Sequence, residues 1–206
     1  MRAQSAGRRL RNDPLDDETI LELVELASHA TAAKRRRTEF VVVRDPDVRH
    51  QLARTYRQGW SIYKRLLRSR AEDAMLEARQ WESDHFEDVP VLVVACVAGR
   101  RPIFPAVGAA AFYAAGFPAV QNLLLAAGAR GLGASATTLP LWSAWEARRT
   151  LGLPNKVTPV AVVALGWPRG PGLPSPAPPV GNIVHLDRWG HQPFRARPRP
   201  VPPDTA

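Results

Sequence analysis

The chain has 206 residues, of which 45% are hydrophobic and 23% are charged, a composition typical of one globular domain with a sizeable core. Its formal net charge of +9 favours contact with anions, such as phosphates, nucleotides or nucleic acid, without choosing among them. Cys96 is the only cysteine, which excludes an internal disulfide and argues against a zinc site built from thiolates. The sequence shows no signal-peptide or membrane-span pattern, so we expect a cytoplasmic protein with no membrane partner.

The N-terminal half predicts helices around one strand. Residues 13–30 place acids before a run of apolar residues at helical spacing, with Asp16 or Asp17 as the expected cap. EFVVVRD (39–45) predicts a strand, and a second helix is expected to begin just after it. Residues 62–86 are charged and helical in pattern, with several aromatic residues in and near them.

The C-terminal half predicts two further strands and a central helix. VPVLVVACVAG (89–99) and KVTPVAVVALGWP (156–168) are nearly continuous apolar runs, typical of strands buried on both faces. Between them, residues 110–134 are apolar almost all round, which indicates a helix buried in the core or in a subunit interface. A short strand or loop at 134–142 and a helix at 143–154 complete the pattern. Helices that cover a small sheet make this an α/β or α+β chain.

Sequence patterns for several other chemistries are absent. GARGLG (128–133) closes a helix, whereas a dinucleotide-binding loop opens one. The five histidines show no ligand spacing, so we expect no metal site. Neither a nucleophile elbow nor a catalytic triad is recognisable, and we assign no catalytic residue from the sequence.

Two clusters remain open to more than one interpretation. Lys34-Arg35-Arg36-Arg37 lies between a predicted helix and a predicted strand. This run could be a nucleic-acid patch, a solvated turn or the wall of an anion site. Four cations in one turn suit a single anion better than a nucleic-acid backbone, so we do not expect a nucleic-acid partner. The aromatic residues Trp60, Tyr63, Trp81 and Phe86 either pack in the core or form a lid over a planar ligand.

The order of these pieces resembles the FMN-dependent nitroreductase family over residues ~4 to ~192. Three stretches carry the resemblance: FPAVQNLLLAAGARGLGASATT (117–138), LGLPNKVTPVAVVALGWPRG (151–170) and FVVVRDPDVRHQLA (40–53). The resemblance implies an α+β fold with a sheet flanked by helices, and a homodimer formed through the long helix at 117–129. We therefore expect one domain at 1–192, followed by a Pro/Arg-rich, disordered tail at 193–206.

The resemblance also implies the site residues. FMN would be held by positions in the N-terminal segment, in the basic loop and after GLG: Arg8, Thr31, Lys34, Arg36, Ala136, Thr137, Thr138 and Leu139. Trp60 and Tyr63 would contact the substrate. Several positions depart from the family pattern: Thr31, Lys34 and Arg36 stand where it has Ser, Asn and Gln, and Pro178 and Pro179 stand where it has a late basic residue.

Two functions follow from this comparison. The first is an NAD(P)H oxidoreductase that uses FMN to reduce a small electron-poor acceptor, such as a nitroaromatic, a quinone or an enone. The alternative, which the departures favour, is a non-catalytic protein of the same fold. It would bind or sequester flavin or another anionic ligand, or partner an active paralogue.

Overall fold

A computed structural model of the chain describes residues 7–30, 37–67, 73–104, 106–170 and 178–195. The chain divides into two compact units, residues 1–173 and 174–206. The predicted boundary between 192 and 193 lies inside the second unit. Among its described residues, this unit contains one helical turn, α6 (Val180–Ile183), and a stack of the His185 and Trp189 rings 4.2 Å apart.

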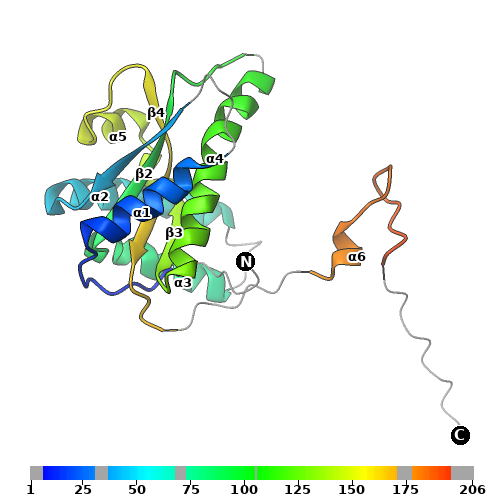
Figure 1. Cartoon of the computed structure of the whole chain (residues 1–206), viewed down its shortest axis with the longest axis horizontal. Coiled ribbons are helices and arrows are strands. Elements are labelled where there is room, and N and C mark those ends of the chain that lie inside the picture. Colours follow the sequence, from blue (N-terminus) through cyan, green and yellow to red (C-terminus); the bar gives the residue numbers. More distant parts are fainter. Residues whose placement is uncertain (1–6, 31–36, 68–72, 105, 171–177, 196–206) are drawn as a thin grey trace, which may run out of the picture. The chain divides into compact units, whose positions relative to one another are not determined.

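The first unit is a four-stranded antiparallel sheet with helices on both faces (Figure 1). The strands are β1 (Thr38–Val43), β2 (Val91–Ala98), β3 (Gly133–Thr137) and β4 (Val157–Gly166), in the order β1-β2-β4-β3. The helices are α1 (Asp17–Ser28), α2 (Pro46–Leu67), α3 (Asp73–Asp84), α4 (Ala106–Ala129) and α5 (Ala144–Thr150), with short 3₁₀ turns η1 (Phe86–Asp88) and η2 (Leu139–Leu141). The predicted α+β class and the three long predicted strands are confirmed.

The two central strands hold the core together because both of their faces are covered. Every residue of β2 from Val91 to Val97 is buried, and so is β4 from Val160 onward. Alternate residues of these strands pack against α1 and α4 on one face, and against α2 and η1 on the other. The continuous apolar runs in the sequence therefore reflect burial on both sides of the sheet.

Helix caps follow the sequence closely. Asp16 caps α1, with its Oδ1 accepting a hydrogen bond of 2.7 Å from the backbone N–H of Thr19. Ser143 caps α5 and accepts from the backbone N–H of Glu146 at 3.3 Å. These are the expected roles of short polar side chains at N-caps.

Helix α4 begins earlier than the sequence indicated. It runs from Ala106 and continues through Pro118, and it is long and apolar enough to cross a membrane by length and composition alone, a property that core helices share. Its outer surface carries exposed apolar residues, among them Val107 (71% exposed) and Phe117 (44%). The prediction of a helix apolar on all sides is correct, but one of its faces is uncovered in the single chain.

A β-bulge in β4 lets α4 approach the sheet closely. The β2–β4 register passes from Ala95↔Ala161 to Cys96↔Pro159, which leaves Val160 as the extra residue. Val160 packs in the α4-side core, where a Cβ added to Gly116 would lie 2.8 Å from its Cγ2 atom. Only glycine fits at this contact without displacing side chains.

Two glycines of α4 give a matched stability test. Gly116→Ala should lower the free energy of unfolding by about 1–2 kcal/mol, because overpacking outweighs the better helix propensity of alanine. Gly128→Ala, where the added Cβ meets nothing within 4 Å, should raise it by about 0.5–1 kcal/mol. Urea unfolding measures both, and equal effects of the two changes would contradict the close approach at Gly116.

Candidate functional site

A small pocket lies at the C-terminal end of β3, the edge strand of the sheet. It has a volume of about 330 Å³, within the range of small-molecule sites. Its lining combines aromatic side chains, one arginine and the end of the strand: Tyr63, Arg79, Phe117, Ala136, Thr137, Thr138, Leu139, Trp142 and Ala161. The pocket therefore offers flat apolar surfaces together with the exposed backbone of β3.

The free edge of β3 supplies main-chain hydrogen-bonding groups to this pocket. In an antiparallel strand, the N–H and C=O of one residue point to the same side, and the side alternates along the chain. The C=O of Ala134 points away from β4 and accepts from the backbone N–H of Gly7 at 3.1 Å. Two residues further, the N–H and C=O of Ala136 point to that same edge, and no backbone group among the described residues pairs with them there, so they can pair with a ligand.

A buried carboxyl group lies directly behind β3. Glu82 of α3 is only 3% exposed, and it accepts hydrogen bonds from Ser135 Oγ and, at 3.3 Å, from the hydroxyl of Tyr56. Arg8 Nε stands 3.3 Å from Glu82 Oε2 in an ion pair that lacks hydrogen-bond geometry. The network joins the N-terminal segment, α2, α3 and β3 at one point.

Burial decides the protonation of this carboxyl group. Desolvation raises the pKa of Glu82 above its ordinary value of 4.5, against the opposing effects of Ser135, Arg8 and Arg79. The same burial, with Glu82 as a neighbour, raises the pKa of the Tyr56 hydroxyl. The interior behind β3 is therefore a place where charge is costly.

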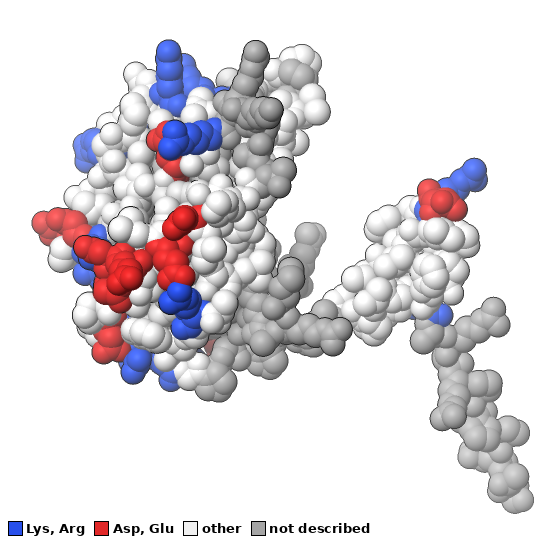
Figure 2. Space-filling model, viewed as in Figure 1, with Lys and Arg blue, Asp and Glu red and all other residues white. Residues whose placement is uncertain are grey.

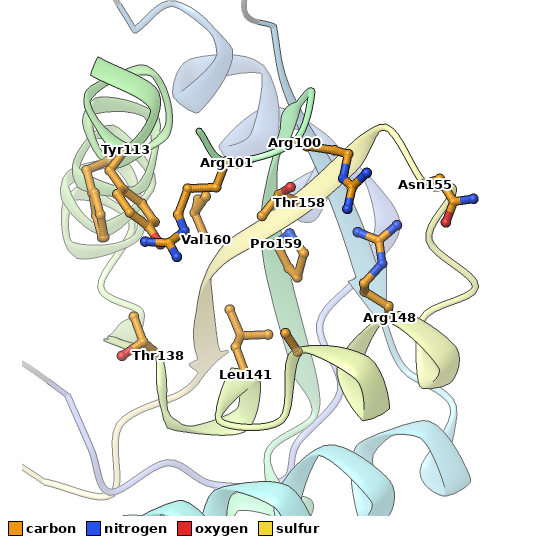
Figure 3. Close-up of a pocket in the computed structure, with 12 residues that line it drawn as sticks. Arg100, Arg101, Tyr113, Thr138, Leu141, Arg148, Asn155, Thr158, Pro159 and Val160 are labelled. Carbon is orange, nitrogen blue, oxygen red and sulfur yellow. The ribbon is translucent and has the colours of Figure 1, made fainter. Parts of the chain in front are cut away.

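A second, larger pocket of about 910 Å³ adjoins the first and shares Phe117 and Thr138 with it (Figure 3). It is lined by the β2–α4 loop, α4, the β3–α5 connection and the start of β4: Arg100, Arg101, Tyr113, Phe117, Thr138, Leu141, Ala144, Arg148, Asn155, Thr158, Pro159 and Val160. The bulge at Pro159 and Val160 and the short length of β3 leave this part of β4 without a neighbour on that side. The bulge in β4 and the short length of β3 thus both border the larger pocket.

The structure brings together part of the predicted site. Ala136 to Leu139 and Tyr63 line the small pocket. Trp60 is 2% exposed, and its Nε1 donates to Gln80 Oε1 at 3.0 Å, so it packs in the core beside Tyr63, with ring centroids 6.4 Å apart.

The remaining predicted residues lie elsewhere. Arg8 is turned toward Glu82, with 19% of its side chain exposed. Thr31, Lys34 and Arg36 lie outside the described residues, so their role in an anion grip stays a prediction. Residues 62–86 form the end of α2 and then α3 within the described part of that stretch, as expected.

Other lining residues were not identified from the sequence. Arg79, Phe117 and Trp142 approach the pocket from α3, α4 and the turn before α5. No short motif joins them, because only the fold brings these segments together. The adjacent pair Arg100-Arg101 directly after a buried strand was a readable signal, since such loops commonly line sites.

Known proteins match the chain along most of its length. The nitroreductase family model matches residues 2–167. The NADPH:FMN oxidoreductase of Vibrio harveyi, in complex with NAD⁺, is 20% identical with a TM-score of 0.68, over 91% of this chain and 75% of that one. Iodotyrosine deiodinase bound to FMN and 3-iodo-L-tyrosine is 18% identical with a TM-score of 0.68, over 91% and 96% of the two chains. Nitroreductase A of Vibrio parahaemolyticus is 19% identical with a TM-score of 0.68, over 91% and 74%.

The raised pKa of Glu82 predicts a pH-dependent stability. Above pH 4.5 the unfolded chain loses this proton while the folded protein keeps it, so the Glu82 contribution lowers the free energy of unfolding as pH rises toward the folded pKa. Glu82→Gln removes this contribution. The difference in the free energy of unfolding, variant minus wild type, should therefore be more positive at pH 8 than at pH 5, which means a relatively more stable variant at pH 8. Urea unfolding at both values tests this, with Glu77→Gln, an exposed position on α3, as the baseline. The opposite trend would mean that Glu82 is stabilised as a carboxylate by Arg8.

Proposed function

This chain belongs to the nitroreductase family, and from that premise we propose that it is an FMN-dependent oxidoreductase. It would take electrons from NAD(P)H and pass them to a small electron-poor acceptor such as a nitroaromatic, a quinone or an enone. The observation that carries the proposal is the small pocket at the open edge of β3, which presents the backbone of Ala136 between aromatic side chains.

The residues present suit a flavin. An isoalloxazine ring is flat, and its pyrimidine edge carries both hydrogen-bond donors and acceptors. The N–H of Ala136 offers the complementary donor and its C=O the complementary acceptor, while Tyr63, Phe117 and Trp142 offer apolar surface for the ring. FMN, when bound, would supply the two-electron chemistry, and the protein supplies position, electrostatics and exclusion of water.

Arg79 gives the pocket its local charge. Its guanidinium lines the small pocket from α3, close enough to Glu82 to oppose the rise in the pKa of that carboxyl. A fixed cation beside a bound ring stabilises negative charge that develops on it.

One observation favours the non-catalytic alternative. Arg8, the basic residue expected at the FMN phosphate, is turned toward Glu82 behind β3. If it keeps that position, the phosphate loses one contact and the affinity for FMN falls. The visible spectrum of the purified protein after incubation with FMN separates the two functions. A bound flavin that NAD(P)H bleaches supports the enzyme, and a colourless protein contradicts it.

We further propose that the functional form is a homodimer joined through α4. The exposed face of this helix is built from apolar and small residues at helical spacing: Val107, Ala110, Ala111, Ala114 and Phe117. A contiguous apolar surface of this kind is typical of protein–protein interfaces. Phe117 also lines both pockets, so a second subunit seated on this face would border the site.

The role of the β3 edge can be tested at Ala136. Ala136→Pro removes the N–H of Ala136, which points to the pocket, while sparing the ladder to β4, since proline is tolerated on a strand edge. FMN affinity, measured by fluorescence quenching, should fall at least about tenfold, the loss expected for a well-aligned hydrogen bond in a partly closed site. Ala136→Gly keeps the N–H and should stay within about threefold of wild type. Unchanged FMN affinity in Ala136→Pro would place the ring elsewhere.

The dimer proposal predicts a specific response to charge on α4. Ala114→Arg should convert a particle of twice the chain mass into a monomer of 22.6 kDa in light scattering, because it buries an unpaired charge at the interface. Leu21→Arg, on an exposed site of α1 that is 67% accessible, should remain dimeric. A wild-type monomer at micromolar concentration would contradict the proposal.

A further inference from the structure

The larger pocket collects positive charge without an acid in its lining. Of its twelve lining residues three are arginines, Arg100, Arg101 and Arg148, and none is aspartate or glutamate. Within the described residues, these three arginines take part in none of the ion pairs that the structure records. Elsewhere on the unit, arginines such as Arg44 and Arg130 are paired with carboxylates.

The arginines are held at the pocket by fixed backbone. Arg148 of α5 donates to the carbonyl oxygens of Pro154 and Val157, which orients its guanidinium toward the start of β4. Arg100 follows Gly99, whose N–H donates to the carbonyl of Lys156 at 2.6 Å and whose φ of 107° suits only glycine. The loop that carries Arg100 is therefore fastened to the same end of β4.

The arginines lie on two sides of β4. Figure 3 shows the guanidinium groups of Arg100 and Arg148 turned toward one another on one side, and Arg101 beside Tyr113 of α4 on the other. Two guanidinium groups that face each other repel unless an anion lies between them, and an anion there gains charge-assisted hydrogen bonds from both.

Charge elsewhere does not explain this arrangement. Burial raises the pKa of the Cys96 thiol to about 11. Glu39 of β1 also raises this pKa and Arg148 lowers it, so both charged groups lie near Cys96. Yet Glu39 is not part of the pocket lining. On the face shown in Figure 2, acidic side chains gather near α1, while the described Lys and Arg side chains form no continuous stripe. The three arginines of the pocket lie around the start of β4, an arrangement unlike an extended row of cations that follows a nucleic-acid backbone.

We propose that the larger pocket binds the anionic group, a carboxylate or a phosphate, of a small planar molecule between Arg100 and Arg148. The apolar lining residues Tyr113, Phe117 and Leu141 take the body of that molecule, and Thr138 joins the pocket to the small one. Identification of this molecule as the acceptor or the electron donor rests on the proposed oxidoreductase function. The anion site itself does not.

Two pairs of probes distinguish the sources of the anion. 4-Nitrobenzoate against 4-nitrobenzamide represents an acidic acceptor, and adenosine 2′-monophosphate against adenosine represents the 2′-phosphate of NADPH. Isothermal titration with the purified full chain, before any reductant is added, should show at least about tenfold tighter binding of the anionic member in at least one pair. Arg100→Gln should reduce that preference at least about fivefold, since each charge-assisted bond in a partly exposed pocket contributes this much or more.

The control is Arg149→Gln on α5, the helix that also carries Arg148. Arg149 carries the same charge but lies 4.8 Å over the ring of Trp145, outside the pocket lining, and its loss should change the preference less than about twofold. Arg148→Lys keeps the charge but not the fork geometry and should fall between these two variants.

Three results would overturn the proposal. They are no preference for the anion in either pair, equal losses in Arg100→Gln and Arg149→Gln, or a change of oligomeric state in Arg100→Gln with binding intact. The last would make the pocket a contact between copies of the chain. Turnover of the neutral 4-nitrobenzamide is measured separately, so a protein that binds anions but reduces nothing refutes the oxidoreductase function alone.

Discussion

The buried carboxyl group of Glu82 is the point on which the geometry of the site depends. It lies on α3, yet its contacts reach Tyr56 on α2, Ser135 on β3 and Arg8 in the N-terminal segment. β3 is a short strand at the edge of the described sheet, where β4 is its neighbouring strand, so its position is set by β4 and by this contact behind it. A polar group buried this deeply is stable only when it is satisfied, which makes the arrangement specific.

Among the described residues, the other edge of β3 is free beyond its contact with Gly7. Gly7 pairs with Ala134, and the strand then runs on to Ala136 with its main-chain groups pointing away from the sheet. An unpaired strand edge usually invites association with another chain, and proteins commonly cover or shorten it. Here five residues are enough to anchor the strand, and the aromatic side chains around its end limit the exposed edge to a pocket.

Much of the fold was readable because the strands are buried on both faces and the caps are local. The apolar runs at β2 and β4, the cap at Asp16 and the cap at Ser143 each follow from a few neighbouring residues. The start of α4 was harder to predict, since Pro105 before the helix and Gly108 in its first turn resemble a loop in sequence.

The site was only partly readable for a different reason. Ala136 to Leu139 could be placed because the resemblance to the family assigns the positions after GLG to the flavin, whereas Trp60 and Tyr63 are close in sequence yet lie in different environments. The rotation of a helix decides which of two such residues faces the core, and a sequence with aromatics on several sides does not fix it. Arg79 carries no sequence pattern until tertiary packing brings α3 to the sheet, and the pair Arg100-Arg101 marks a loop after a strand without showing which other segments that loop meets.

The bulge in β4 connects these observations. An extra residue at Val160 turns the start of the strand, lets Gly116 pack tightly against it and separates this end of β4 from β3. The same turn exposes a section of strand to which the loop of Arg100 and the helix of Arg148 are both attached. One irregularity therefore sets the approach of α4, which carries the apolar outer face, and also creates the cationic pocket. A change that straightened β4 at Pro159 would alter the position of α4 and the shape of the larger pocket together, because both depend on the same turn of the strand.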